Sequence, residues 1–149
     1  MTATSERPIL VVEDNPDDME LALRALREHD AGHQIALARD GVEASEFLFG
    51  SSEHDARALP IVVFLDLNLP KVSGFEVLRR IRSHARTRLL PVVVLTSSRE
   101  EEDIVSSYSL GANSYVRKPV DYVAFRSAVH ALGDYWLALN EAPPEEDDE

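Results

Sequence analysis

Short apolar runs alternate with amphipathic segments along the chain. The apolar runs lie at residues 8–14 (PILVVED), 34–38, 61–66 (IVVFLD), 91–96 and 114–119. Between them, residues 16–29, 41–49, 74–84 and 100–110 place apolar residues at helical spacing, and a long final helix is predicted from about Asp121. Runs that are apolar throughout are typical of parallel strands covered by helices on both faces. The pattern therefore predicts five β/α repeats in an α/β fold.

The predicted architecture is a doubly wound five-stranded parallel sheet with helices on both faces and the flavodoxin-like strand order 2-1-3-4-5. Asn15 can cap the first helix, Pro16 fits its first turn, and Gly111 can close the fourth helix in a left-handed conformation. The first helix is predicted to bury a stripe formed by Met19, Ala22, Leu23 and Leu26. A basic run is interpreted as a solvent-exposed helix face, and it comprises Arg79, Arg80, Arg82, Arg86 and Arg88.

Polar side chains stand at the carboxyl ends of four predicted strands, where ligands of open α/β sheets bind. Glu13 and Asp14 follow the first strand, Asp66 the third, Thr96 the fourth and Lys118 the fifth. With the order 2-1-3-4-5, the three carboxylates converge between strands one and three. They would repel one another unless a cation neutralised them, and hard oxygen ligands with room for water suit Mg²⁺.

Each of these residues also has an ordinary interpretation. Glu13 and Asp14 could be solvated acids before a helix cap, Thr96 a strand-end hydrogen bonder and Lys118 a solvated lysine. Four matched strand ends favour a site. In that site the Asp66 carboxylate is a candidate nucleophile toward a phosphoryl group, with the Thr96 hydroxyl and the Lys118 ammonium near the phosphoryl oxygens.

The stretches VVEDNPDD, LDLNLPKVSG, VVLTSS and SYVRKP, within residues 7–135, resemble the receiver domain of two-component response regulators. The resemblance implies that a histidine kinase phosphorylates Asp66 and that Glu13 and Asp14 hold Mg²⁺ together with Asp66. It also implies a signalling protein that supports only its own phosphotransfer and autodephosphorylation, and is otherwise not an enzyme.

The same resemblance implies roles for four further positions. Asn68 would offer its backbone carbonyl to the metal, and Thr96 would be the switch hydroxyl. Lys118 would pair with a phosphoryl oxygen. Tyr115 matches the switch aromatic, whose ring turns inward on activation, and the bond between Lys118 and Pro119 is expected to be cis.

Length and charge limit the alternatives. A chain of 149 residues fits one domain, predicted as a disordered N-terminus at 1–6, a receiver domain at 7–140 and an acidic disordered tail at 141–149. A net charge of −12 argues against direct binding to nucleic acid. No signal peptide or membrane span is evident, which predicts a cytoplasmic protein. The chain has no cysteine, which excludes disulfides and thiolate zinc sites.

Output is expected from the receiver itself, as in a stand-alone regulator, because only one helix and the tail follow Pro119. The apolar stripe of that helix comprises Phe125, Val129, Leu132, Trp136 and Leu139. Its end carries the candidate dimer residues Tyr135, Trp136 and Leu139, although packing onto the domain is the alternative.

The wording EDNPDD, DLNLP and the insertion GSSEHDARALP resemble short regulators associated with phytochrome-type histidine kinases. That resemblance implies a bacteriophytochrome as the kinase and a homodimer formed through the fourth helix, fifth strand and fifth helix.

Three other functions fit less well. A phosphatase resembling haloacid dehalogenases needs a second Asp where Asn68 stands, and it needs a cap domain. A pseudo-receiver should lack one of the key groups, and none is missing. An FMN protein would need a Ser/Thr-rich phosphate loop after strand one, where VVEDNPDD would repel phosphate.

Overall fold

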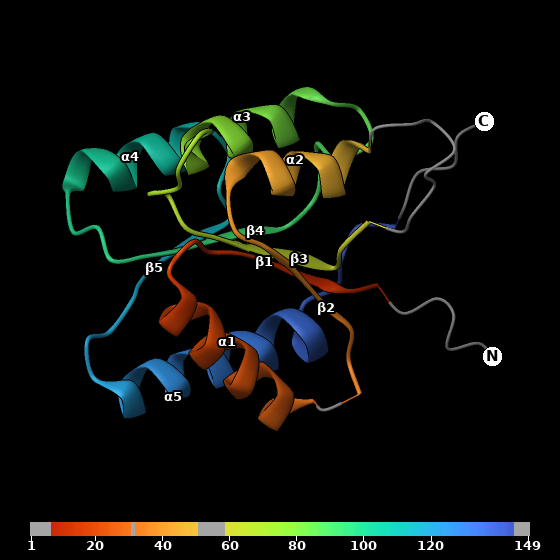
Figure 1. Ribbon diagram of the computed structural model, residues 1–149. Helices are drawn as coiled ribbons and strands as arrows, with labels where there is room; N and C mark the ends of the chain where they lie inside the picture. Colours follow the sequence, from red (N-terminus) through yellow and green to blue (C-terminus); the bar gives the residue numbers. More distant parts are fainter. Residues whose placement is uncertain (1–6, 31, 51–58, 145–149) are drawn as a thin grey trace.

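The computed structural model describes residues 7–30, 32–50 and 59–144. A five-stranded parallel sheet with the order β2-β1-β3-β4-β5 forms its centre (Figure 1). The strands are β1 (Ile9–Val12), β2 (Ile35–Ala38), β3 (Val62–Leu65), β4 (Val92–Thr96) and β5 (Ser114–Arg117). The predicted fold class and strand order are confirmed.

Helices cover both faces of the sheet. On one face lie α2 (Gly41–Phe49), α3 (Gly74–Ser83) and α4 (Glu101–Ser109), and on the other α1 (Pro16–His29) and α5 (Tyr122–Gly133) (Figure 1). Side chains alternate across each strand, so β1 sends Leu10 and Val12 into one core cluster and Ile9 and Val11 into the other. The sheet therefore lies between two apolar cores, and its parallel strands place their carboxyl ends at one edge.

The predicted N-terminus at 1–6, most of the insertion at 51–58, and residues 145–149 of the predicted tail lie outside the described residues. Among the residues that the structure does describe, no helix combines the length and the apolar character needed to cross a bilayer.

The ends of the helices follow from local sequence. The Asn15 side chain accepts hydrogen bonds from the backbone N–H groups of Asp17 and Asp18, and Pro16 is the first helical residue. Gly111 has φ = 104° just beyond α4, as expected of a left-handed helix end. In α1 the buried stripe comprises Met19, Ala22, Ala25 and Leu26. The prediction was wrong for Leu23, which is half-buried, because it lies about 100° of helix rotation from Ala22, at the rim of the stripe.

The final helix is longer than α5 alone, as predicted, but its last turns change character. After Gly133 the chain continues as a π-helical segment, η2 (Asp134–Leu139), in which the Asn140 N–H donates to the Tyr135 carbonyl at 2.6 Å. Trp136 packs against the core cluster of the α1 and α5 face. Tyr135 and Leu139 are 47% and 72% exposed. Of the three candidate dimer residues, Trp136 thus packs onto its own domain, while Tyr135 and Leu139 face solvent.

Arg82 departs from the predicted solvent-exposed basic face. Its guanidinium donates twice to the Gly111 carbonyl, at 2.9 and 2.7 Å, and to the Leu90 carbonyl at 2.8 Å. Further bonds reach the Arg88 carbonyl and the Asn113 side chain. The planar fork of an arginine can satisfy several carbonyls at once, so Arg82 joins the end of α3 to the loop before β4 and to the turn between α4 and β5.

Replacing Arg82 with alanine should lower the free energy of unfolding by about 2–3 kcal/mol, because several carbonyls lose a charged donor together. Arg79→Ala is the matched control, since Arg79 makes an exposed ion pair with Glu76 at 2.7 Å. It should cost no more than about 0.5 kcal/mol. Urea unfolding of both variants measures the difference, and equal losses would contradict the structural role of Arg82.

Candidate functional site

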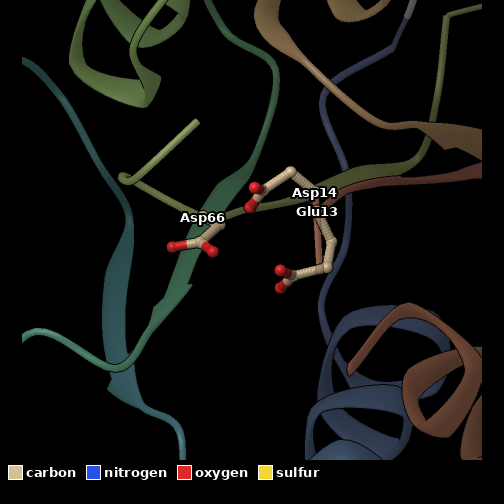
Figure 2. A group of neighbouring side chains, drawn as sticks. All are labelled: Glu13, Asp14 and Asp66. Carbon is tan, nitrogen blue, oxygen red and sulfur yellow. The ribbon is translucent and has the colours of Figure 1, made fainter. Parts of the chain in front are cut away.

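Three carboxylates meet at the carboxyl ends of β1 and β3. Glu13 and Asp14 follow β1, and Asp66 follows β3. One oxygen from each lies within 4.8 Å of the others, and Figure 2 shows Glu13 and Asp14 extending toward Asp66. Glu13 and Asp66 are buried, whereas Asp14 is exposed. The parallel register of β1 and β3, with Val12 opposite Leu65, brings the acids together because all three lie within two residues of the end of their strand.

The two oxygens of Asp66 have different partners. The buried Thr96 hydroxyl donates to Oδ1 at 2.8 Å, and the Asn68 backbone N–H reaches the same oxygen at 3.3 Å. The Lys118 Nζ lies 3.3 Å from Oδ2. Thr96 is the last residue of β4, and Lys118 directly follows β5. All four strand ends named by the sequence therefore contribute side chains to one place.

Lys118 contacts two further acids besides Asp66. Its Nζ lies 2.5 Å from Glu13 and 2.9 Å from Asp18, and its side chain is only 8% exposed. Burial alone would lower the pKa of Lys118, but hydrogen bonds to Glu13 and Asp18 and the charge of Asp66 raise it above its ordinary value. Lys118 is therefore a fixed cation beside Asp66.

Glu13 experiences the opposite balance. Burial raises its pKa from the ordinary 4.5 to about 7, and the charge of Asp66 adds to the increase, although the hydrogen bond from Lys118 opposes it. One ammonium thus faces the carboxylates of Glu13, Asp18 and Asp66, with Asp14 alongside. A site of hard oxygen donors with an excess of negative charge fits Mg²⁺, so the residues present suit the predicted metal.

In metal-free buffer, Glu13→Gln should stabilise the fold at pH 8 by about 1–3 kcal/mol. A carboxyl with a raised folded-state pKa is stabilised by its proton, fully below pH 4.5, and that contribution is lost as pH rises through about 7. Glutamine mimics the protonated form, so its advantage should vanish at pH 4.5 and be greatest at pH 8. Urea unfolding in EDTA at both values tests this, and an advantage that is the same at both would contradict it.

Tyr115 and Ser98 connect the site to α4. Tyr115 is half-buried against the core on the α2, α3 and α4 face, and its hydroxyl donates to the Ser98 carbonyl at 3.1 Å. The Ser98 hydroxyl donates to Asp103 in the first turn of α4 at 2.6 Å. The ring of Tyr115 is therefore turned inward, toward the loop that follows Thr96.

The peptide bond between Lys118 and Pro119 is trans, so the prediction of a cis bond at Pro119 was wrong. The trans isomer of an X-Pro bond is intrinsically favoured by about 0.5–1 kcal/mol. Lys118 reaches Glu13, Asp18 and Asp66 from the trans chain. The contacts at the site therefore do not require the cis isomer.

Sequence reasoning missed two residues of the site. Asp18 was not among the predicted site residues, yet it pairs with Lys118. Asn15 was assigned as a cap, and its backbone N–H also donates to the Glu13 carboxylate at 3.0 Å. The available signal was closeness in the sequence to Glu13 and Asp14, since Asn15 caps α1 and Asp18 lies in its first turn.

Comparison with known proteins identifies the family. A model described as the response regulator receiver domain matches residues 9–130. The chain belongs to the response regulator receiver domain family. Members of this family are signalling proteins that receive phosphoryl groups from histidine kinases, and they bind Mg²⁺ or Mn²⁺ at an acidic pocket.

Several solved receivers resemble the chain over nearly its whole length. The phosphorylated cyanobacterial phytochrome response regulator RcpA is 36% identical, with a TM-score of 0.88 over 94% of this chain and 100% of that one. Rcp1 of Synechocystis sp. is 36% identical over 87% of this chain and 88% of its own. Its Mn²⁺-bound form has a TM-score of 0.86 at 35% identity, over 93% of this chain and 99% of that one.

The bacteriophytochrome response regulator AtBRR is 50% identical, with a TM-score of 0.69 over 91% of this chain and 98% of that one. The predicted resemblance to regulators associated with phytochromes is confirmed at the level of related sequences and structures.

Proposed function

We propose that this receiver accepts a phosphoryl group from a histidine kinase onto Asp66. The observation that carries the proposal is the set of contacts to Asp66. A buried carboxylate has a hydroxyl on one oxygen and an ammonium on the other, beside two further acids. The neighbours of Asp66 are themselves buried or charged. Gathering such groups around one buried carboxylate is costly, so a purely structural role explains the arrangement poorly.

Phosphoryl transfer requires mainly positioning and charge neutralisation. A carboxylate oxygen of Asp66 would form the new bond to phosphorus as the bond from phosphorus to the donor imidazole nitrogen breaks. The imidazole leaves with the bonding electrons and takes up a proton. Lys118 would then pair with a phosphoryl oxygen, and the Thr96 hydroxyl would move its hydrogen bond from the carboxylate to the phosphoryl group.

Glu13, Asp14, Asp66 and the backbone carbonyl of Asn68 would hold Mg²⁺, directly or through water. When bound, the ion supplies neutralisation of the charge on the phosphoryl oxygens. Tyr115 would act as the switch aromatic, since its hydroxyl already contacts the loop that follows Thr96. The movement of Thr96 would thereby reach α4 through Ser98 and Asp103.

Incubation with acetyl phosphate, with and without Mg²⁺, tests the assignment by intact mass. A gain of one phosphoryl group that depends on Mg²⁺ is expected. No gain with acetyl phosphate, together with no transfer from any phosphorylated histidine kinase, would overturn it.

A phytochrome-type histidine kinase is the proposed donor, supported by the similarity to RcpA, Rcp1 and AtBRR. Transfer from a phosphorylated bacteriophytochrome kinase should be faster than transfer from a kinase of an unrelated pathway at equal concentration. Equal rates would remove the phytochrome assignment and leave the receiver function intact.

The proposed output is homodimerisation on a surface that includes the end of the chain's last helix and the face of α4, β5 and α5. Exposed apolar side chains support this, and they are Val105, Tyr108, Val123, Tyr135 and Leu139. Comparing the dissociation constant of the dimer in the unphosphorylated and the phosphorylated protein decides whether phosphorylation controls dimerisation.

Leu139→Ser should weaken the dimer by at least about tenfold in dissociation constant without loss of folding, because Leu139 contributes to no core cluster and is mostly exposed. Sedimentation velocity over a concentration series, with and without phosphorylation, measures the change. Trp136→Ala is unsuitable as the test, since Trp136 packs against the core and its loss would also destabilise the monomer. An unaltered dimer in Leu139→Ser would exclude this part of the surface.

We also propose that the receiver acts as a stand-alone cytoplasmic regulator, with its domain at 7–140 and with no direct contact to nucleic acid or membrane. Its own phosphotransfer and autodephosphorylation would be its only chemistry. The acidic net charge of −12 supports the lack of nucleic-acid binding.

A further inference from the structure

The loop between β3 and α3 carries Asp66 and Asn68. The start of α2 contacts this loop at Lys71 and Val72. Gly41 is the first residue of α2 and lies against Val72 in that loop. A Cβ atom placed on Gly41 would lie 2.2 Å from the Val72 carbonyl oxygen and 2.5 Å from the Val72 Cβ. Real Cβ atoms essentially never make contacts this short, so a side chain at position 41 would push α2 and the loop apart.

The same part of the loop holds an unusual backbone conformation. Lys71 has φ = 69°, and it is the one non-glycine residue with positive φ among the described residues. The Val72 N–H donates to the Pro70 carbonyl at 2.8 Å, which makes Lys71 the centre of a three-residue turn of the rare, strained kind. A strained turn persists only where its surroundings hold it in place.

The start of α2 provides that support. Asp40 caps α2 by accepting from the Glu43 N–H at 2.8 Å, and its other oxygen lies 3.3 Å from the Lys71 Nζ. Asp40 is largely buried, with 12% of its side chain exposed. Asp40 therefore fixes Lys71 through an ion pair, and Gly41 leaves room for Val72 because it has no side chain. Val72 in turn packs on the apolar core.

A displacement of Val72 would reach Asp66 because the loop is hydrogen-bonded onto itself. The Gly74 and Leu69 N–H groups both donate to the Leu67 carbonyl, at 3.0 and 3.2 Å. The Asn68 N–H contacts the Asp66 carboxylate at 3.3 Å. At the other end of the loop, a Cβ on Gly74 would lie 2.2 Å from the Asp66 carbonyl oxygen, so Asp66 has little room to adjust.

We propose that Asp40 and Gly41 are positioning residues for the phosphoacceptor loop: they fix Lys71 and Val72, and thereby place Asp66 and Asn68 for binding Mg²⁺ and the phosphoryl group. This inference rests on the proposed function for its metal and phosphoryl readouts. It assigns a role at the site to a helix that contributes no side chain to the acidic cluster.

Gly41→Ala tests the inference in two measurements. By calorimetry, Mg²⁺ should bind about tenfold more weakly than to the native chain, as is typical when a supporting contact of a metal ligand is lost. In the metal-free protein, the amides of residues 67–73 should exchange with solvent faster, a readout that needs no metal.

Two control variants separate positioning from general loss of stability. Gly32→Ala adds the same methyl group where nothing lies within 4 Å. Ala25→Gly weakens α1 at a buried position away from the loop. Both should keep the native affinity for Mg²⁺ and native amide exchange at 67–73, even where the melting temperature of Ala25→Gly falls as far as that of Gly41→Ala.

Lys71→Met is the second variant, and it decides the question if Gly41→Ala does not fold. Removing a positive charge near a divalent-cation site would by itself strengthen Mg²⁺ binding. Loss of positioning would weaken it, so the sign of the change separates the two effects. Binding about two- to threefold weaker supports the inference, whereas equal or tighter binding overturns it.

The inference also falls if Gly41→Ala folds and retains both the native affinity and native amide exchange. Failure of the proposed function has a different signature, namely a native chain that binds no Mg²⁺ and accepts no phosphoryl group. In that case amide exchange at 67–73 in the metal-free variants still decides whether α2 positions the loop.

Discussion

Asp66→Asn should accept no phosphoryl group from acetyl phosphate or from a histidine kinase, with modification below about 1% of the native level. An amide oxygen is a poor nucleophile and cannot form the acyl phosphate. The fold should survive, because the amide oxygen of the substituted side chain can still accept the hydrogen bond from Thr96, whose hydroxyl lies 2.8 Å from Oδ1 in the native chain. Intact mass after incubation with Mg²⁺ measures the loss.

Asp17→Asn is the matched control for Asp66→Asn, because it removes one carboxylate that is exposed in the first turn of α1. It should be phosphorylated like the native chain. Persistent, Mg²⁺-dependent labelling of Asp66→Asn at full extent would show that the phosphoryl group goes elsewhere. Equal loss in both variants would point to the total charge of this edge as the cause, instead of the nucleophile.

Lys118→Ala should lower the free energy of unfolding of the metal-free protein by about 2–4 kcal/mol, because it leaves acids buried without their cation. Glu13 and Asp66 both lose their pairing with Nζ, and the partly exposed Asp18 loses its own. Mg²⁺ should recover part of this loss, and should stabilise Lys118→Ala more than it stabilises the native chain. Urea unfolding with EDTA or Mg²⁺ measures both effects.

Lys118→Ala should still be phosphorylated in Mg²⁺, since the nucleophile remains, but it should lack the structural response to phosphorylation. Amide exchange in α4, compared before and after modification, measures that response. The other lysine of the chain offers a matched control for the loss of stability, because Lys71 is 65% exposed and its ammonium pairs with Asp40. Lys71→Met should cost at most about 1 kcal/mol. A similar loss in both lysine variants would contradict the role of Lys118 as the buried cation of the site.

Both predictions depend on what the strand order does to residues far apart in the chain. Asp66 and Lys118 are separated by 52 positions, and Lys118 and Asp18 by 100. The alternation of apolar runs and helices was enough to predict a parallel sheet, because strands covered on both faces must be apolar throughout. Once the order 2-1-3-4-5 was assumed, the strand ends could be placed at one edge, and Glu13, Asp14, Asp66, Thr96 and Lys118 lie there.

Other assignments needed the tertiary structure because they depend on which other parts of the folded chain lie next to each residue. Leu23 and Ala25 flank the predicted stripe of α1 on its two sides, and only the packing against the sheet and α5 decided that Ala25 is buried while Leu23 is half-buried. Arg82 looked like its arginine neighbours in sequence, yet its guanidinium reaches backbone carbonyls of the loop before β4 and of the turn after α4. Trp136 belongs to a stripe whose later members leave the core, and sequence periodicity cannot say where a helix passes the end of a sheet.

The fold class, the strand ends that carry chemistry and the residue types of the site could all be predicted from the chain, because they depend on local periodicity and on where each apolar run stops. Packing was needed to settle which oxygen of Asp66 meets Thr96 and which meets Lys118. Packing also brought Asp18 to Lys118 and set Gly41 of α2 against Val72. These features arise from contacts between elements that are distant in the chain, and such contacts leave no periodic signal in the sequence.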